Sequence, residues 1–156
     1  MRKLAFVLSF FFILPLASYA ADSLDQLLQT YAVNTKTLDG LTATLVTDIQ
    51  AAHNSDEAAT RIESYATVYH AVAQTFQNLM PAFLKSNTAG TVSALQRQSM
   101  IESSQRMTEL GKTLTSESDA FDDALKPYQN DSRVSVAVTT FANEGHALQA
   151  IAQQYK

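Results

Sequence analysis

Apolar residues recur along this chain at spacings of three, four and seven positions, which is the pattern of amphipathic helices rather than of strands. The first such segment predicts a helix over residues 23–52. It starts at Ser23, and Gln26 follows three positions later, which is the spacing of a capping box. Its apolar face carries Leu24, Leu27, Leu28, Tyr31, Leu38, Leu41, Leu45 and Ile49.

The second segment has the strongest amphipathic pattern and follows a break at residues 53–55. Asn54 and Glu57 again have the spacing of a cap. Pro81 is expected to kink or end this helix, because proline lacks the N–H that continues the helical ladder. Residues 85–90 are mostly polar and end in glycine, so we predict a loop there.

The third segment, residues 91–126, has an apolar position that recurs every seven residues, which favours one continuous helix. Gly111 and the stretch 113–118 leave open whether this helix is bent or split in two. Residues 127–131 predict a turn, and Ser132 is the expected cap of a last helix. The recurring residues are Met100, Met107, Leu114, Phe121 and Tyr128.

Four amphipathic helices joined by short connections bury their apolar faces most economically in an antiparallel up-down-up-down four-helix bundle. We therefore predict an all-α protein with this topology. The chain of 156 residues has only 4 glycines and 3 prolines, which agrees with a high helix content. No linker or change of composition divides it, so residues 21–156 are expected to form one domain.

The first twenty residues differ from the rest and are typical of a cleavable signal peptide. A basic start at residues 2–3 precedes an apolar run over residues 4–14, and Ser18 and Ala20 place small side chains before the expected cleavage point. We predict cleavage after Ala20. The apolar run is shorter than the roughly 20 residues that a membrane span needs, so no membrane anchor is expected after cleavage.

Charge and cysteine content exclude several classes of function. The chain has 11 basic and 15 acidic residues, and removal of residues 1–20 takes away Arg2 and Lys3, leaving 9 basic residues and a net charge of −6. Such a chain has no basic face for phosphates, so we expect no nucleic-acid partner. It has no cysteine for a disulfide, a covalent haem or a lipid anchor. Export then predicts a free periplasmic protein, with full secretion as the alternative.

Short stretches at both ends of the expected mature chain, together with the first predicted hairpin, resemble the soluble periplasmic b-type cytochromes. They are residues 21–25, 54–59 and 153–156. The resemblance implies a four-helix bundle. In that family a methionine early in the first helix and a histidine near the end of the last hold the haem. Leu27 and Ala152 stand at those positions here, and neither side chain ligates iron, so we predict no cofactor.

Three histidines are the remaining candidate ligands. His70 and His146 lie one position off the apolar faces, and if both turned inward they could hold a haem or a transition metal. Histidines at such positions more often bind water or a neighbouring side chain. His53 precedes Asp56 and Glu57, which makes a weak surface metal contact conceivable. We predict no metal site, because neither Glu-x-x-His pairs nor H-E-x-x-H occurs.

Two other groups of residues have structural interpretations. Met100 and Met107 are expected to fill the core. The acidic cluster at residues 117–123 is expected to be a solvated helix face, because a calcium site needs a tight loop that usually contains glycine. Its members are Glu117, Asp119, Asp122 and Asp123.

No set of side chains in the sequence predicts catalysis, which requires a nucleophile with a positioned base. We therefore expect an exported, non-enzymatic protein that binds an unknown periplasmic protein or a small ligand, as an adaptor, inhibitor or chaperone-like factor. The alternative is a haem- or metal-binding bundle that uses His70 and His146. An enzyme would require His70 in a deep pocket within hydrogen-bond reach of Glu63 or Glu144. The oligomeric state is open, since apolar faces also suit a partner helix.

Overall fold

The computed structural model describes residues 23–155, which form six α-helices, one short 3₁₀ turn and no strand. The all-α prediction is confirmed. The predicted signal peptide, residues 1–20, and its cleavage site after Ala20 lie outside the described residues. The elements are α1 (Leu24–Thr42), α2 (Leu45–Gln50), α3 (Ser55–Thr88), α4 (Ala94–Ser116), α5 (Ser118–Leu125), η1 (Lys126–Tyr128) and α6 (Ser132–Gln153).

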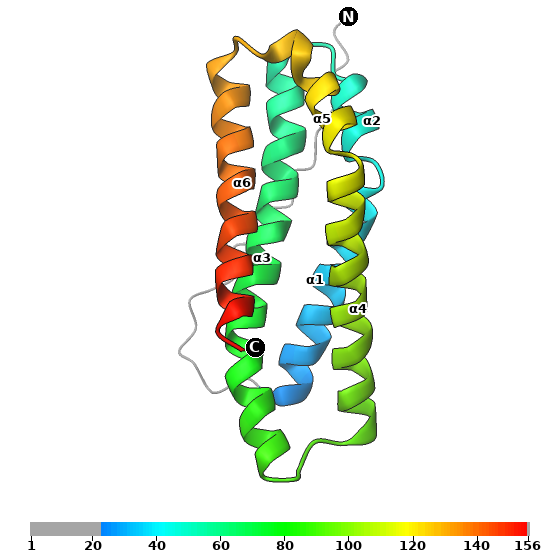
Figure 1. Ribbon diagram of the computed structural model, residues 1–156, viewed down its shortest axis with the longest axis vertical. Coiled ribbons are helices and arrows are strands. Elements are labelled where there is room, and N and C mark those ends of the chain that lie inside the picture. The colour runs from blue at the N-terminus through cyan, green and yellow to red at the C-terminus, as the bar shows by residue number, and fades with distance from the viewer. Residues whose placement is uncertain (1–22, 156) are drawn as a thin grey trace, which may run out of the picture.

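Figure 1 shows these elements in four columns that run side by side along the long axis: α1 with α2, α3, α4 with α5, and α6. Helix α3 packs against α1 and α6, α1 also packs against α4, and α2 packs against α3 and α5. Within residues 23–155, α4 and α6 make no comparably extensive contact. No helix of this part of the chain combines the length and the hydropathy of a membrane span.

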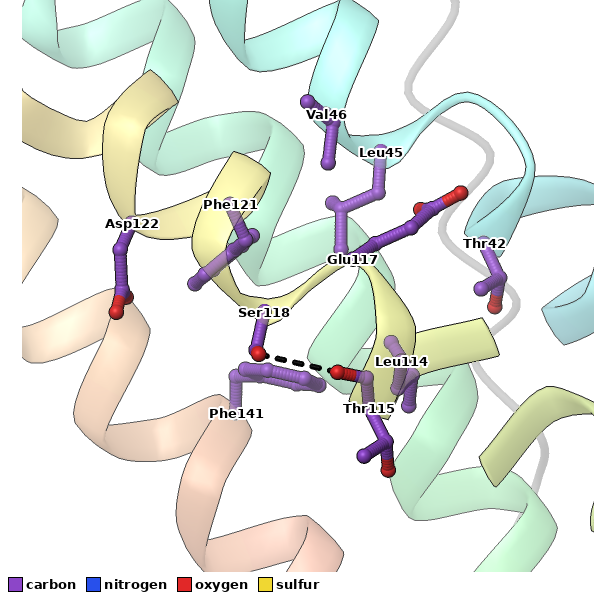
Figure 2. A pocket seen from close by; sticks show the side chains of 10 residues that line it. All are labelled: Thr42, Leu45, Val46, Leu114, Thr115, Glu117, Ser118, Phe121, Asp122 and Phe141. Atoms are coloured by element: carbon purple, nitrogen blue, oxygen red, sulfur yellow. Dashed lines mark hydrogen bonds between the residues drawn. The ribbon is translucent and has the colours of Figure 1, made fainter. Parts of the chain in front are cut away.

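Two of the columns are interrupted, and the interruptions lie near each other. The helix predicted over residues 23–52 breaks at Ala43 and Thr44, so the prediction of one continuous helix was wrong. The column of α4 and α5 continues through Gly111 and breaks at Glu117, as the stretch 113–118 had left open. At this break the Ser118 hydroxyl donates to the backbone carbonyl of Thr115 at 3.0 Å (Figure 2). Side-chain hydroxyls of this kind compete with the helical ladder and favour its ends.

Local side chains explain most helix starts. Ser23 and Gln26 form the predicted capping box, and Asn54 accepts the backbone N–H of Glu57 at 2.9 Å as predicted. A second capping box between Ser93 and Gln96 was missed in the sequence, and it starts α4 later than the expected residue 91. Each cap satisfies backbone donors that the first helical turn leaves without a partner.

The start of α6 differs from the prediction by one residue. Asp131, rather than Ser132, is the cap, and its carboxylate accepts the backbone N–H groups of Val134 and Arg133. The bond from Val134 is the main reason that the pKa of Asp131 lies below its usual value. A carboxylate suits this position because it also faces the positive end of the helix dipole.

The end of α3 also differs from the prediction. The helix continues through Pro81 to Thr88, so it does not end at Pro81, one of the two outcomes expected there, and the loop expected from residue 85 was wrong. Residues on either side of the proline, such as the fully buried Leu79, hold the helix against its neighbours, and this packing offsets the lost ladder bond. The helix stops where Gly90 takes a φ of 71°, a left-handed conformation that glycine adopts without strain.

Helix α3 supplies the largest part of the core. Tyr65, near its middle, is 1% exposed, and its hydroxyl lies 2.7 Å from the Thr42 hydroxyl of α1. Burial raises the pKa of this phenol above its ordinary value, so the group stays neutral. The buried residues of α3 are Ala58, Ala59, Ile62, Tyr65, Ala66, Tyr69, Val72, Ala73, Thr75 and Leu79.

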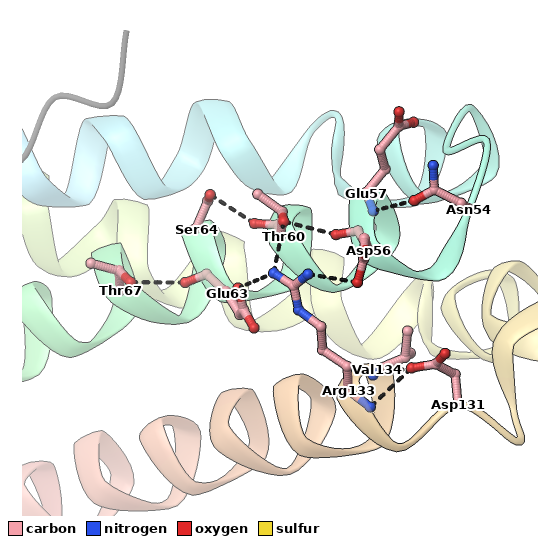
Figure 3. Close-up of polar contacts among 10 residues, drawn as sticks. All are labelled: Asn54, Asp56, Glu57, Thr60, Glu63, Ser64, Thr67, Asp131, Arg133 and Val134. Atoms are coloured by element: carbon pink, nitrogen blue, oxygen red, sulfur yellow. Dashed lines mark hydrogen bonds and ion pairs between the residues drawn. The ribbon is translucent and has the colours of Figure 1, made fainter. Parts of the chain in front are cut away.

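The interface between α3 and α6, called here the α3–α6 seam, is the most extensive helix contact in the described residues. Buried alanines such as Ala66 on α3 and Ala137 on α6 add little bulk, so the two helices can pack closely. At one end of the seam the Arg133 guanidinium donates to the Asp56 carboxylate at 2.7 Å (Figure 3). It also reaches Glu63 at 3.4 Å. These exposed pairs fix orientation more than they add stability.

Candidate groove between α4 and α6

The other flank of α6 is open. A groove of about 760 Å³ separates it from α4, a volume within the range of roughly 300–1,000 Å³ that small-molecule sites usually have. We call it the α4–α6 groove. It is lined by Tyr31, Tyr69, Phe76, Ser104, Met107, Thr108, Gly111, Gly145, Leu148, Gln149 and Ala152.

Three aromatic side chains from α1 and α3 contribute to the lining of the groove. Tyr31 is 2% exposed and Tyr69 is 9% exposed, so only a small part of each reaches the open space. The rings of Tyr31 and Phe76 lie 5.5 Å apart between centroids. Because α1 and α3 pack against each other, these rings are held by the core. A rigid aromatic surface of this kind suits the face of a planar apolar molecule.

Two glycines leave space open on opposite sides of the groove. Gly111 lies inside α4 and Gly145 inside α6, and a Cβ atom added at either position would meet nothing within 4 Å. Neither glycine is therefore required for a close approach of two helices. Glycine inside a helix costs roughly 1 kcal/mol relative to alanine, so the chain accepts this cost twice at one groove. Alanine at these positions would make the helices more stable but would narrow the α4–α6 groove.

The polar groups of the groove are uncharged. Burial raises the pKa of Tyr31 to about 12 and also raises that of Tyr69, so both phenols keep their protons at neutral pH. Neither phenol hydrogen-bonds to another described residue, and no buried side-chain oxygen or nitrogen in residues 23–155 lacks a partner. Both tyrosine side chains belong to the lining of the groove. Ser104 and Gln149 add polar groups, and no Asp, Glu, Lys, Arg or His lines it.

The structure places His70 away from this groove. Its Nδ1 atom lies 2.8 Å from the Glu144 carboxylate, in a separate hollow of about 310 Å³ between α3 and α6 that Glu63 also lines. An enzyme was expected to hold His70 beside such a carboxylate in a deep pocket. The His70 side chain is 51% exposed, however, so solvent reaches the pair freely. Access of water to this pair argues against proton-transfer chemistry that requires a site from which water is excluded.

His146 does not join His70. It follows Glu144 by two positions on α6, which places the two side chains about 200° apart around the helix axis. Since Glu144 faces His70, His146 projects away from it and is exposed. The facing pair of histidines that the haem or metal alternative requires is not formed, because the helical repeat brings Glu144 to that position instead.

The other candidate metal ligands also remain apart. His53 is exposed and donates its backbone N–H to Glu57, and its ring takes no part in a cluster. Within the described residues, no three His, Asp or Glu side chains come together in an arrangement that would hold a metal ion. In the acidic cluster, Asp123 pairs with Lys126 at 2.6 Å, and Asp119, Asp122 and Asp123 are exposed, as expected for a solvated helix face.

The residues of the groove do not supply the two ligands that hold haem in the b-type cytochromes, which parts of the sequence resemble. Ala152, which stands at the position of that family's histidine ligand, lines the groove but carries no donor atom. Leu27 packs against the core and offers none either. Met107 supplies a thioether in the groove without a histidine opposite it. Met100 and Met107 both pack against the core, as predicted.

No known protein family, curated protein or solved structure matches this chain. The groove itself was not foreseen in the sequence. Gly111 was considered only as a point where the third helix could bend or split, and no role was assigned to Gly145. A signal was present, since both glycines interrupt apolar helical segments that nevertheless continue on either side.

Proposed function

We propose that this chain is a non-enzymatic binding protein whose α4–α6 groove takes an uncharged, mostly apolar small molecule with a planar ring. The observation that carries the proposal is the pair of mid-helix glycines, Gly111 and Gly145, which leave space in the groove at a cost in helix stability. Proteins accept such local costs where a site requires them.

The chemistry of the lining supports this class of ligand. The aromatic rings of Tyr31, Tyr69 and Phe76 offer apolar area, and the absence of charged side chains disfavours an ionic ligand, which would lose its hydration without gaining a partner. The Tyr31 and Tyr69 hydroxyls and the Gln149 amide can bind one or two polar groups of the ligand. Burial of the apolar part contributes about 25 cal/mol for each Å² removed from water.

We further propose that the four columns run up-down-up-down in chain order as a four-helix bundle. Its closely packed neighbours α3 and α6 run in the same direction, since Arg133 meets Asp56 at their starts and Glu144 meets His70 farther along. We also propose that residues 21–156 act in the periplasm after cleavage following Ala20. Full secretion is the alternative location. A free exported protein with a neutral groove suits a carrier or a sensor of a sparingly soluble compound. The haem alternative has weaker support, because His70 and His146 both lie outside the groove.

The test uses N-phenyl-1-naphthylamine, an uncharged two-ring dye whose fluorescence rises in an apolar site. Protein expressed from its full sequence should enhance the fluorescence with a saturable dependence on concentration. The variants Gly111→Leu and Gly145→Leu should lose most of this enhancement, since leucine fills space that is now open. Circular dichroism should show that both variants keep the helix content of the parent protein.

Gly40→Leu is the matched control. Gly40 also lies inside a helix, meets nothing within 4 Å of an added Cβ, and does not line the groove. It should bind the dye like the parent protein. The proposal fails if the parent protein binds no dye, or if Gly40→Leu loses binding to the same degree as Gly145→Leu.

A further inference from the structure

A second, smaller pocket lies where the two interrupted columns meet. We call it the break pocket, because the α1–α2 break and the α4–α5 break both border it. Its volume is about 260 Å³, and Figure 2 shows the side chains around it. The lining residues are Thr42, Leu45, Val46, Leu114, Thr115, Glu117, Ser118, Phe121, Asp122 and Phe141.

Most of the pocket wall is apolar. Phe121 of α5 and Phe141 of α6 lie 5.9 Å apart between ring centroids, and Leu114 and Leu45 complete the surface. A cavity of about 150 Å³ is known to hold a benzene ring. The break pocket at 260 Å³ therefore has room for one six-membered ring and a short substituent.

The electrostatic environment of the break pocket is negative. The carboxylates of Glu117 and Asp122 belong to its lining, and no Lys, Arg or His does. The carboxyl ends of α1 and α4 border the pocket, but so do the amino ends of α2 and α5, so the helix dipoles at the two breaks oppose one another. The negative environment therefore comes from the two carboxylates, which border an apolar space whose lining contains no cation.

We propose that the break pocket binds a small organic cation, in which one apolar ring carries a protonated amine on a short arm. The ring packs against Phe121 and Phe141, and the ammonium group lies at the pocket mouth, where the carboxylates of Glu117 and Asp122 stand on opposite sides (Figure 2). An ammonium group near an aromatic face is also attracted by the ring itself. This site is separate from the α4–α6 groove, which has no charged residue and shares no lining residue with it.

The experiment compares three ligands of similar size by NMR titration of protein expressed from its full sequence. The probes are 2-phenylethylammonium, the uncharged 2-phenylethanol and the anionic phenylacetate. We expect the ammonium to bind most tightly, about tenfold more tightly than the alcohol, and the acetate to bind least. The double variant Glu117→Gln/Asp122→Asn should weaken ammonium binding about five- to tenfold and leave the alcohol unchanged.

Two controls separate this site from general effects. Asp119→Asn removes one charge from the same helix at a position outside the lining, and it should change ammonium binding less than twofold. Gly145→Leu, which fills the groove, should leave ammonium binding intact, so a failure of the groove proposal would not affect this one. The inference is overturned if 2-phenylethylammonium does not bind, if it binds no better than 2-phenylethanol, or if Gly145→Leu abolishes its binding.

Discussion

Helix α6 has two flanks that use small residues in opposite ways. On the flank toward α3, small buried side chains such as Ala66 and Ala137 let two helices pack closely along the α3–α6 seam. On the flank toward α4, Gly111 and Gly145 face open space, and no comparable contact forms. Small residues therefore do not by themselves indicate close packing. Their meaning depends on whether another backbone approaches them.

The same contrast separates α3 from α4 as whole helices. Helix α3 buries ten residues, whereas α4 buries only Ser103 and Leu110. A helix with neighbours on two sides stabilises the core, while a helix with one main neighbour is free to border a binding site. We expect local opening to involve α4 more readily than α3, because α4 has fewer buried apolar side chains.

The largest expected effect tests the closely packed helix α3. Ile62 of α3 is 1% exposed, and Ile62→Ala should lower the free energy of unfolding by about 2–5 kcal/mol, through lost apolar burial and the cavity left behind. Urea denaturation measures this change. Leu95→Ala on α4 is the control, since Leu95 is 83% exposed and its truncation should change stability by less than about 0.5 kcal/mol. Equal losses in the two variants would contradict the assigned core.

The next effect tests whether the Tyr31 ring is held in a low-dielectric environment. Its folded-state pKa of about 12 lies above the ordinary value of 10.0, so the folded state favours the neutral phenol. The resulting stability is present below pH 10 and is lost as the pH rises toward 12, where the loss reaches roughly 2–3 kcal/mol. Denaturation curves at increasing pH should show this decline.

Tyr31→Phe has no proton to lose at that position, so its stability should fall less steeply between pH 10 and 12. Tyr65 and Tyr69 also have raised pKa values, and part of the decline should therefore remain in this variant. Identical pH profiles for the parent protein and Tyr31→Phe would show that Tyr31 is not held as the structure describes.

A third prediction places the same added bulk on the two flanks of α6. Ala137 is 1% exposed, so Ala137→Leu should overpack the α3–α6 seam and cost about 1–3 kcal/mol. Gly145→Leu enters open space and should leave stability unchanged or slightly higher. Thermal unfolding measures the stability of the two variants relative to the parent protein. If both lose stability alike, the groove is closed in solution.

The smallest expected effect concerns the cost of the glycines. Gly145→Ala should stabilise the protein by about 0.5–1 kcal/mol, because alanine loses less backbone freedom on folding and meets no neighbour here. Gly90→Ala provides the opposite case, since Gly90 has a φ of 71° that alanine adopts only with strain. It should destabilise the protein. Chemical denaturation measures the change in the free energy of unfolding. A change of the same sign in both variants would contradict the assigned backbone conformations.

Much of the secondary structure was predictable because its signals are local. The caps at Ser23 and Asn54 depend on side chains three residues apart, and the structure confirms both. The errors occurred where packing overrides local preference. Helix α3 passes through Pro81 because residues on both sides remain packed, and the first column breaks at Thr44 although its apolar pattern continues.

Candidate site residues were harder to predict, because helical rotation and neighbour choice decide which side chains meet. His70 meets Glu144 rather than His146, since two steps along α6 turn the side chain away. The acidic cluster was expected to be a solvated helix face, and Asp119, Asp122 and Asp123 are exposed. The sequence did not show that Glu117 and Asp122 also border the break pocket, because that pocket forms between helices distant in sequence.

Periodicity, caps and composition establish that this chain is helical and acidic, because these properties depend on neighbours within a few residues. The prediction of export is also local, because it depends only on the pattern of residues 1–20. The open flank between α4 and α6 and the break pocket arise from contacts among helices distant in sequence. No local pattern encodes such spaces, because a void is defined by which surfaces fail to meet.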